Sequence, residues 1–205
     1  LDILIQKYNP SYLIFGYDNY FGYQKTGSYK YVKNSNKYKN INCIQVNQYE
    51  NSEELVKTSN IKKLILDSKI DIANQYLYTK YKLFGYVDEG YKIGRTLGFP
   101  TANINVNIEQ IIPGNGVYSV NLLVGNNIYK GICNIGVCPT LHNKKKRSIE
   151  VHIIDKSINL YNCKVIVEFI KYIRSEQKFN SKEDLINQIK EDILSLKEER
   201  IIESE

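Results

Sequence analysis

Hydrophobic and polar residues alternate over short segments in the second part of the chain, from about Lys80 onward. Successive side chains of a strand point to opposite faces, so this alternation predicts strands with one buried face. Turn residues such as Gly125-Asn126-Asn127 separate the segments and predict hairpins. The predicted strands are residues 81–87, 101–106, 117–124, 127–136, 148–155 and 163–173. Short strands in this number predict an antiparallel barrel or sandwich.

The end of the chain has the spacing of an amphipathic helix. Ser181 stands three residues before Asp184, which resembles a capping box at a helix start. The positions of the expected buried stripe are Leu185, Ile189, Ile193 and Leu196. We therefore expect a C-terminal helix that packs across the flank or an end of the strands.

The first part of the chain mixes helical and strand patterns. Residues 1–7 fit the end of a helix, which Asn9-Pro10 closes because the residue before a proline disfavours helix. Residues 11–18 predict a buried strand followed by a polar loop, the place where open α/β sheets bind nucleotides. Residues 41–49 predict another strand, and residues 52–79 predict two short helices.

These patterns together indicate an α+β protein of two domains. We expect a partial Rossmann-like α/β domain over residues 1–79 and the strand-rich domain with its terminal helix over residues 80–205. The chain begins with Leu1 and not with Met, in the middle of a helical pattern, so we expect it to be a fragment of a longer protein.

Composition and charge narrow the function classes. The formal net charge is +6, which suits an anionic small ligand or a nucleic acid. Only Lys144 to Arg147 form a basic run, and no basic helix with interleaved aromatic residues is present, so we expect no nucleic-acid partner. The four cysteines are widely spaced and form no C-x-x-C, which argues against a zinc site or a redox pair. Without a signal peptide or an apolar run that could span a bilayer, we expect a cytoplasmic protein with no membrane partner.

One glycine-rich segment concentrates groups that suit phosphate binding. Gly90, Lys92, Gly94 and Arg95 precede the predicted strand at 101–106. Glycines let the backbone approach a bulky ligand closely, and the two cations supply positive charge and donors. The segment therefore predicts a phosphate-facing loop, although the same residues also fit a simple surface hairpin.

The strand after this loop supplies oxygen atoms. Thr101 and Asn103 stand two residues apart, so their side chains share one face of an extended segment. A hydroxyl and an amide carbonyl suit Mg²⁺, which takes one or two protein ligands together with waters and substrate phosphates. The G-x-x-x-x-G-K-[ST] motif of P-loop enzymes is absent, which leaves other routes of phosphoryl transfer open.

The string GRTLGFPTANI resembles the signature of the riboflavin kinases, in particular the kinase module of the bacterial bifunctional riboflavin kinase/FMN adenylyltransferases (FAD synthetases). The resemblance implies a six-stranded Greek-key barrel with a terminal helix over residues 80–205. It also implies an ATP-dependent transferase that phosphorylates the ribityl 5′-hydroxyl of riboflavin to give FMN. The implied partners are small molecules, ATP with Mg²⁺, riboflavin and FMN, and the oligomeric state stays open.

Glu150 is the candidate catalytic residue. In the segment RSIEVHIID, Ile149, Val151 and Ile153 share one face, and Glu150 and His152 share the other. The pattern alone fits a solvated strand glutamate, but the resemblance of IEVHIID to the family segment with the catalytic Glu implies a general base. A packing role is the expectation for His152.

Two further segments carry candidate substrate contacts. CNIGVCPT resembles the family's N-I-G-x-x-P-T and implies a binding role for Asn134, although Cys138 and Leu141 depart from the residues often found there. IRSEQKF resembles an R-x-E-x-x-F flap and implies that Arg174 closes over flavin or phosphate. An ion pair of Arg174 with Glu176 or a neighbouring strand is the competing interpretation.

Residues 1–79 resemble the C-terminal part of the family's nucleotidyltransferase-like domain. The match rests on IFGYDNYFG and on KTSNIK at 57–62, where Asn60 and Lys62 replace two expected residues. The H-x-G-H motif of adenylyltransferases is absent, and the only histidines are His142 and His152. The alternatives to a kinase alone are a fragment of a bifunctional enzyme that also adenylylates FMN to FAD, and a non-catalytic flavin- or nucleic-acid-binding barrel.

Overall fold

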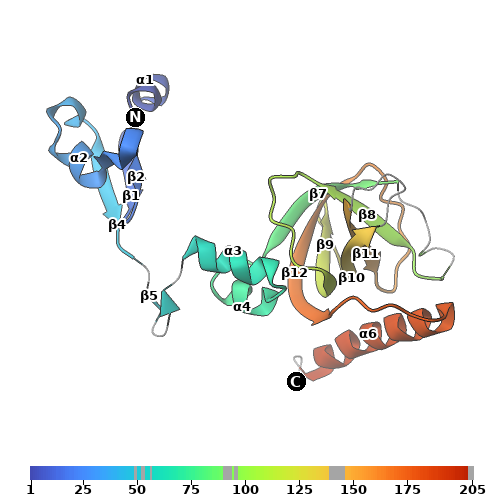
Figure 1. Cartoon of the computed structure of the whole chain (residues 1–205). Coiled ribbons are helices and arrows are strands. Elements are labelled where there is room, and N and C mark those ends of the chain that lie inside the picture. The colour runs from blue at the N-terminus through green and yellow to red at the C-terminus, as the bar shows by residue number, and fades with distance from the viewer. Residues whose placement is uncertain are drawn as a thin grey trace. The chain divides into compact units, whose positions relative to one another are not determined.

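The computed structural model describes residues 1–48, 50–51, 54–55, 57–89, 94, 97–138 and 146–202. The chain forms two compact units, Leu1–Val56 and Lys57–Glu205. Figure 1 shows the order of their elements. No helix in these residues is long and apolar enough to cross a membrane.

The first unit is small and has a parallel pair of strands. Its elements are α1 (Asp2–Tyr8), β1 (Tyr12–Gly16), β2 (Tyr20–Phe21), a 3₁₀ turn (Tyr23–Lys25), β3 (Gly27–Ser28), α2 (Tyr29–Asn34), a second 3₁₀ turn (Asn36–Tyr38), β4 (Asn42–Val46), β5 (Glu50–Asn51) and β6 (Glu54–Leu55). β1 pairs in parallel with β4, with Ile14 directly opposite Ile44. The core of this unit is Phe15, Val32 and Tyr38. The strand at 11–18 was expected to be buried, but only Phe15 of β1 is, and Ile14 is 66% exposed.

Six strands of the second unit close into a barrel. They are β7 (Lys82–Asp88), β8 (Thr101–Val106), β9 (Gly116–Val124), β10 (Asn127–Cys138), β11 (Lys146–Ile153) and β12 (Lys164–Arg174). The order around the barrel is β10-β11-β8-β7-β12-β9, and the neighbours are antiparallel. β9, β10 and β11 are consecutive neighbours, and β12 returns to lie beside β9, which is a Greek-key connection. The expected six-stranded antiparallel Greek-key barrel is confirmed.

The interior of the barrel is filled by side chains from every second residue of its strands, which face inward. On β7, Leu83 and Val87 are buried, whereas Phe84 and Tyr86, which lie between them in the sequence, are exposed. Tyr118 from β9 meets Phe169 from β12 edge to face, with ring centroids 5.4 Å apart. Burial of each large apolar side chain contributes roughly 1.5–3 kcal/mol, so this interior fixes which residues remain for the outer face.

Two short helices before the barrel pack on it. They are α3 (Thr58–Leu66) and α4 (Ile70–Gln75), and Ile65, Ile70 and Ala73 belong to the barrel core. This placement differs from the expected boundary after residue 79. The physical reason is that the apolar faces of α3 and α4 are buried against the barrel, so the second unit begins at Lys57.

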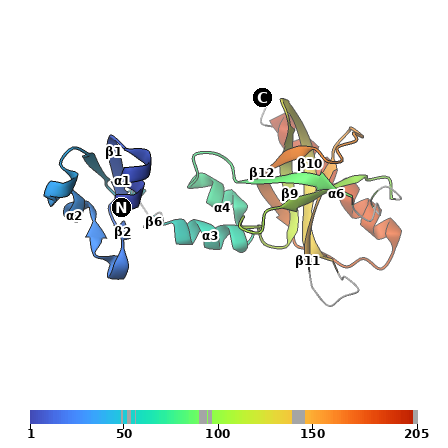
Figure 2. The same cartoon turned by 90° about the horizontal axis from the view of Figure 1, so that it is seen from above.

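The C-terminal helix α6 (Lys182–Ile202) begins as expected, since the Asp184 backbone N–H donates to the Ser181 hydroxyl over 3.0 Å. Figure 1 and Figure 2 both show α6 outside the barrel, alongside its wall. The predicted stripe is half-buried. Its fully buried neighbour is instead a carboxylate, Asp192, which is 4% exposed.

Candidate active site

Strand register gathers the candidate polar residues into one row on the outer face of the barrel. Residues directly opposite each other in an antiparallel pair share a face. The row across β8, β11, β10, β9 and β12 is Asn103, Glu150, Asn134, Val117 and Arg174. Ile149 and Val151, on either side of Glu150, point into the core. The closed barrel therefore places on one face residues that are up to about 70 positions apart in the sequence.

Thr101 lies beside this row and contacts Glu150. It pairs with His152 in the register, and Asn103 pairs with Glu150, so Thr101 and Asn103 share the outer face of β8 next to Glu150 and His152 of β11. The Thr101 hydroxyl donates a hydrogen bond of 3.3 Å to Oε2 of Glu150. Because the proton of the hydroxyl is directed at the carboxylate, the lone pairs of Oγ1 remain available to a cation.

Gly94 is the one residue of the predicted phosphate loop with a described position. A Cβ there would collide with the carbonyl oxygen of Phe99 and lie 3.2 Å from Oγ1 of Thr101. The Phe99 N–H donates to the Gly94 carbonyl over 2.8 Å, which closes a turn against the start of β8. Glycine at 94 is therefore what lets the loop backbone reach Thr101. Gly90, Lys92 and Arg95 lie outside the described residues.

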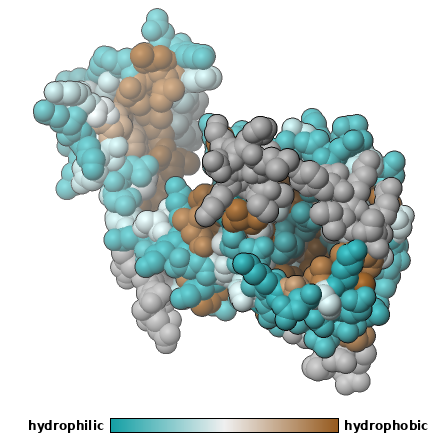
Figure 3. All heavy atoms as spheres, turned by 45° about the vertical axis from the view of Figure 1, so that its right-hand side comes forward, coloured by the Kyte–Doolittle hydropathy of each residue, from teal (hydrophilic) through white to brown (hydrophobic). Residues whose placement is uncertain are grey.

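A pocket of about 350 Å³ opens between this wall and α6. Its apolar lining comes from the segment before β8, the barrel wall, the connection to α6 and α6 itself: Leu97, Phe99, Val117, Ile132, Phe179, Leu185 and Ile189. Figure 3 shows a hollow in this region with hydrophobic side chains inside it. Thr101, Asn134 and Glu150 line the polar side, so an aromatic ligand with a polar tail would find a matching surface for each part.

A larger hollow of about 960 Å³ lies on the outer face of β7 and β12, around Phe84, Tyr86 and Ile166. Among the residues that the structure describes, its lining has no carboxylate, and Lys164 is its charged residue. General base chemistry needs a proton acceptor within hydrogen-bond reach of the substrate. The smaller pocket at Glu150 is therefore the candidate active site.

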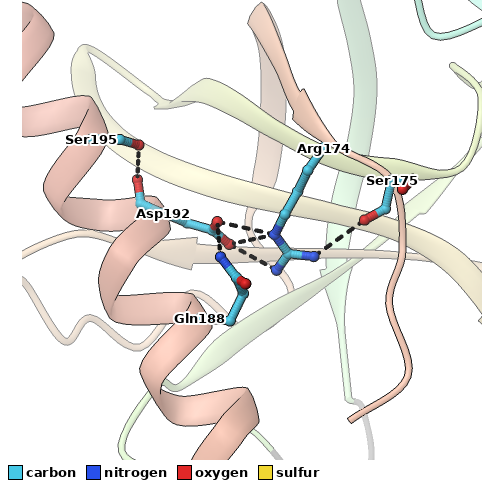
Figure 4. A network of polar contacts seen from close by, with 5 residues as sticks. All are labelled: Arg174, Ser175, Gln188, Asp192 and Ser195. Atoms are coloured by element: carbon cyan, nitrogen blue, oxygen red, sulfur yellow. Dashed lines mark hydrogen bonds and ion pairs between the residues drawn. The ribbon is translucent and has the colours of Figure 1, made fainter.

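Arg174 is held by Asp192 of α6 (Figure 4). The Arg174 Nε donates to both carboxylate oxygens over 3.0 and 3.1 Å, and Nη2 donates to Oδ2 over 2.8 Å. Gln188 adds a hydrogen bond of 3.2 Å to Oδ1. The competing interpretation of Arg174 was an ion pair with Glu176 or with a neighbouring strand. The ion-pair partner in the structure is instead Asp192 of α6. A carboxylate inside the apolar stripe of α6 was the signal for this pair in the sequence.

Glu176 takes part in a second network at the pocket. Its carboxylate lies against the α-carbon of Gly136, where any Cβ would collide with it. Asn115 donates to Glu176 over 3.2 Å and accepts from the Nε of Arg147 over 3.1 Å. Arg147 also donates to the carbonyls of Ile112 and Pro113. No local pattern in the sequence indicates this network, because its members come from separate strands and loops.

Other chemistry is disfavoured around Glu150. Cys133 faces the core opposite Val151, and burial, with a smaller effect of the Glu150 charge, raises the pKa of its thiol well above the ordinary value. A thiol in that state is not a nucleophile at neutral pH. Within the described part of the chain, no group of three or more His, Cys, Asp or Glu residues could hold a metal ion. The neutral oxygens of Thr101 and Asn103 fit Mg²⁺ better than they fit zinc.

The fold and the pocket define a barrel protein with a cavity of small-molecule size beside a carboxylate. A family model described as riboflavin kinase matches residues 77–199. The chain belongs to the riboflavin kinase family. The matched residues include the candidate site residues with a described position, which are Gly94, Thr101, Asn103, Asn134, Glu150 and Arg174.

Curated relatives extend the similarity through most of the chain. The bifunctional riboflavin kinase/FMN adenylyltransferase of Buchnera aphidicola subsp. Schizaphis graminum is 39% identical over 196 residues, 94% of this chain and 62% of the relative. The Bacillus subtilis protein of the same name is 34% identical over 194 residues, 94% of this chain and 61% of the relative. The chain thus spans less than two thirds of the length of these relatives.

A solved structure is also similar. A crystal structure of a protein described as a macrolide-efflux protein from Streptococcus pneumoniae has a TM-score of 0.78 and is 28% identical. The similarity covers 92% of this chain and 60% of the pneumococcal one.

Proposed function

We propose that this chain is an ATP-dependent riboflavin kinase, which transfers the γ-phosphate of ATP to the ribityl 5′-hydroxyl of riboflavin. The observation that carries the proposal is the Glu150 carboxylate in the pocket, 3.3 Å from the Thr101 hydroxyl. Family membership supports the choice of substrates. These substrates, ATP and riboflavin, also favour the cytoplasm as the place of the reaction.

Glu150 is the proposed general base. As the 5′-oxygen of riboflavin forms its bond to the γ-phosphorus, the bond from phosphorus to the ADP oxygen breaks, and Glu150 accepts the hydroxyl proton. The apolar walls around Val117 and Leu185 exclude water and give the flat ring system a surface to pack on. Positioning the hydroxyl beside the carboxylate supplies much of the rate enhancement that the chain itself contributes.

Thr101 and Asn103 are the proposed protein ligands of Mg²⁺. When bound with ATP, the ion would offset the negative charge of the phosphates. Gly94 brings the loop backbone to the same side of Thr101, and Gly90, Lys92 and Arg95 are proposed to face the phosphates. Asn134 and Arg174 are proposed to contact the substrates from the opposite side of Glu150.

The first part of the chain is proposed to belong to a nucleotidyltransferase-like α/β domain. The parallel pairing of β1 with β4 through α2 supports this, because parallel neighbours connected by a helix are the unit of such sheets. A longer chain would then also adenylylate FMN to FAD. We expect these 205 residues alone to form no FAD from FMN and ATP, because they lack the H-x-G-H histidines. Formation of FAD by this chain would contradict that expectation.

The kinase proposal is tested by incubating the chain with riboflavin, ATP and Mg²⁺ and separating the flavins by chromatography. We expect FMN and ADP in equal amounts. Flavin binding without FMN formation would indicate a carrier barrel and would overturn the proposal.

A further inference from the structure

His152 makes a hydrogen bond that a packing role alone does not explain. It follows Glu150 by two positions on β11 and also lines the pocket. Its Nδ1 lies 2.9 Å from the carbonyl oxygen of Pro100. A carbonyl oxygen only accepts, so Nδ1 carries the proton in this bond. The ring also meets Phe99 edge to face, with ring centroids 5.3 Å apart.

Pro100 is the point where the glycine loop enters β8. Proline has no backbone N–H, so its carbonyl is its only main-chain hydrogen-bonding group. The pairing of β8 with β11 begins one residue later, with Thr101 opposite His152. On the other side of Pro100, the Phe99 N–H is bonded to Gly94. The bond from His152 therefore fixes the last peptide before Thr101.

We propose that His152 is a positioning residue, which holds Pro100 and Phe99 so that Thr101 presents its hydroxyl to Glu150 and to the Mg²⁺-nucleotide. This inference rests on the proposed kinase function. A displacement of about 1 Å at a reacting group can cost on the order of 10²-fold in rate, so the anchor of Thr101 matters. The bond of 3.3 Å between Thr101 and Glu150 is long, so small movements of the strand entry weaken it.

Three substitutions of His152 distinguish the contributions of Nδ1, of Nε2 and of the shape of the ring. In His152→Asn the side-chain amide takes the place of Nδ1 and keeps a donor for Pro100. In His152→Gln the amide reaches the place of Nε2, and in His152→Phe the ring and its contact with Phe99 remain without a donor. Calorimetric titration with Mg·ADP and fluorescence titration with riboflavin report the two halves of the site.

We expect the Mg·ADP dissociation constant of His152→Asn to stay within about threefold of the parent. His152→Phe and His152→Gln should raise it on the order of tenfold, the size of one lost hydrogen bond. Riboflavin affinity should stay within about threefold in all three variants. In turnover, the KM for Mg·ATP should follow the same order as the dissociation constant.

The other outcomes contradict the inference in different ways. Loss in His152→Asn with retention in His152→Gln would assign the role to Nε2. Equal loss of Mg·ADP and riboflavin binding, together with a lower Tm, would make His152 a structural residue only. Mg·ADP binding that is unchanged in all three variants would overturn the inference while leaving the kinase proposal intact. A parent chain that binds no Mg·ADP would overturn both.

Discussion

The Arg174 guanidinium and the Asp192 carboxylate form a two-point ion pair that fastens α6 to the end of β12 (Figure 4). The Arg174 side chain is 16% exposed and that of Asp192 is 4% exposed. Removing one partner of a buried pair leaves the other charge without compensation, which typically costs about 3–5 kcal/mol. The wall that Leu185 and Ile189 give to the pocket therefore depends on this pair.

Asp192→Asn should lower the free energy of unfolding by about 3–5 kcal/mol, because Arg174 would lose its counter-charge. Replacing both residues, as in Arg174→Met with Asp192→Leu, should cost less than the sum of the single changes. Urea unfolding of the parent, Arg174→Met, Asp192→Leu and the double variant gives the coupling energy. Strictly additive effects would show that the pair does not hold α6.

Asn74→Ala should destabilise the second unit by about 2–4 kcal/mol. The Asn74 amide bonds the carbonyls of Phe169 and Ile170 over 3.0 and 3.3 Å and accepts from the Tyr81 N–H over 2.8 Å. Each lost bond costs about 1 kcal/mol or more when its partner stays buried. Gln75→Ala, at an exposed neighbouring position, is the control and should stay within about 0.5 kcal/mol. An equal effect of both substitutions would contradict this account.

Local patterns were enough to predict the barrel strands and the start of α6. Alternation fixes which face of a strand is buried, so the outward direction of Glu150 beside the buried Ile149 and Val151 followed from the sequence. The Ser181 cap is also a local interaction and was predictable.

Long-range partners were not predictable in the same way. Asn74 bonds residues 95 and 96 positions further along the chain, so nothing near it in the sequence shows that α4 belongs with the barrel. The Asn115 bridge between Arg147 and Glu176 likewise depends on tertiary folding. The roles assigned to Thr101, Asn103, Asn134 and Arg174 in ligand binding stay predictions.

Thr101→Val should weaken Mg·ADP binding on the order of tenfold, because valine keeps the branched shape and removes the oxygen. Thr101→Ser restores the hydroxyl and should recover most of the affinity. Riboflavin binding should change little in both variants. Calorimetric titration measures each constant, and equal affinity of the valine and serine variants would remove Thr101 from the proposed metal site.

Stability should fall as the pH rises above about 9. Burial raises the pKa of the Cys133 thiol above its ordinary 9.0 and raises that of Tyr118 to about 12. Above pH 9 the unfolded chain loses these protons before the folded chain does, so ionisation favours unfolding. Cys133→Val removes one such group and should reduce the slope of unfolding free energy against pH between about 9 and 11. An unchanged slope would contradict the assignment to Cys133.

The central claim is that Glu150 accepts the proton of the riboflavin hydroxyl. Glu150→Gln keeps the size of the side chain and its reach to Thr101 but removes its basicity. Its matched control is Glu168→Gln on β12, a carboxylate bonded to Asn121 and Lys82 and absent from the pocket lining. The control should keep the parent kcat.

The most direct measurement is the kcat for FMN formation by Glu150→Gln at saturating riboflavin and Mg·ATP. We predict a fall of about 10²- to 10⁴-fold, the usual contribution of a general base, with an unchanged Mg·ADP dissociation constant and Tm. A kcat within a few-fold of the parent would contradict the claim and would leave Glu150 as a strand residue that merely faces the pocket.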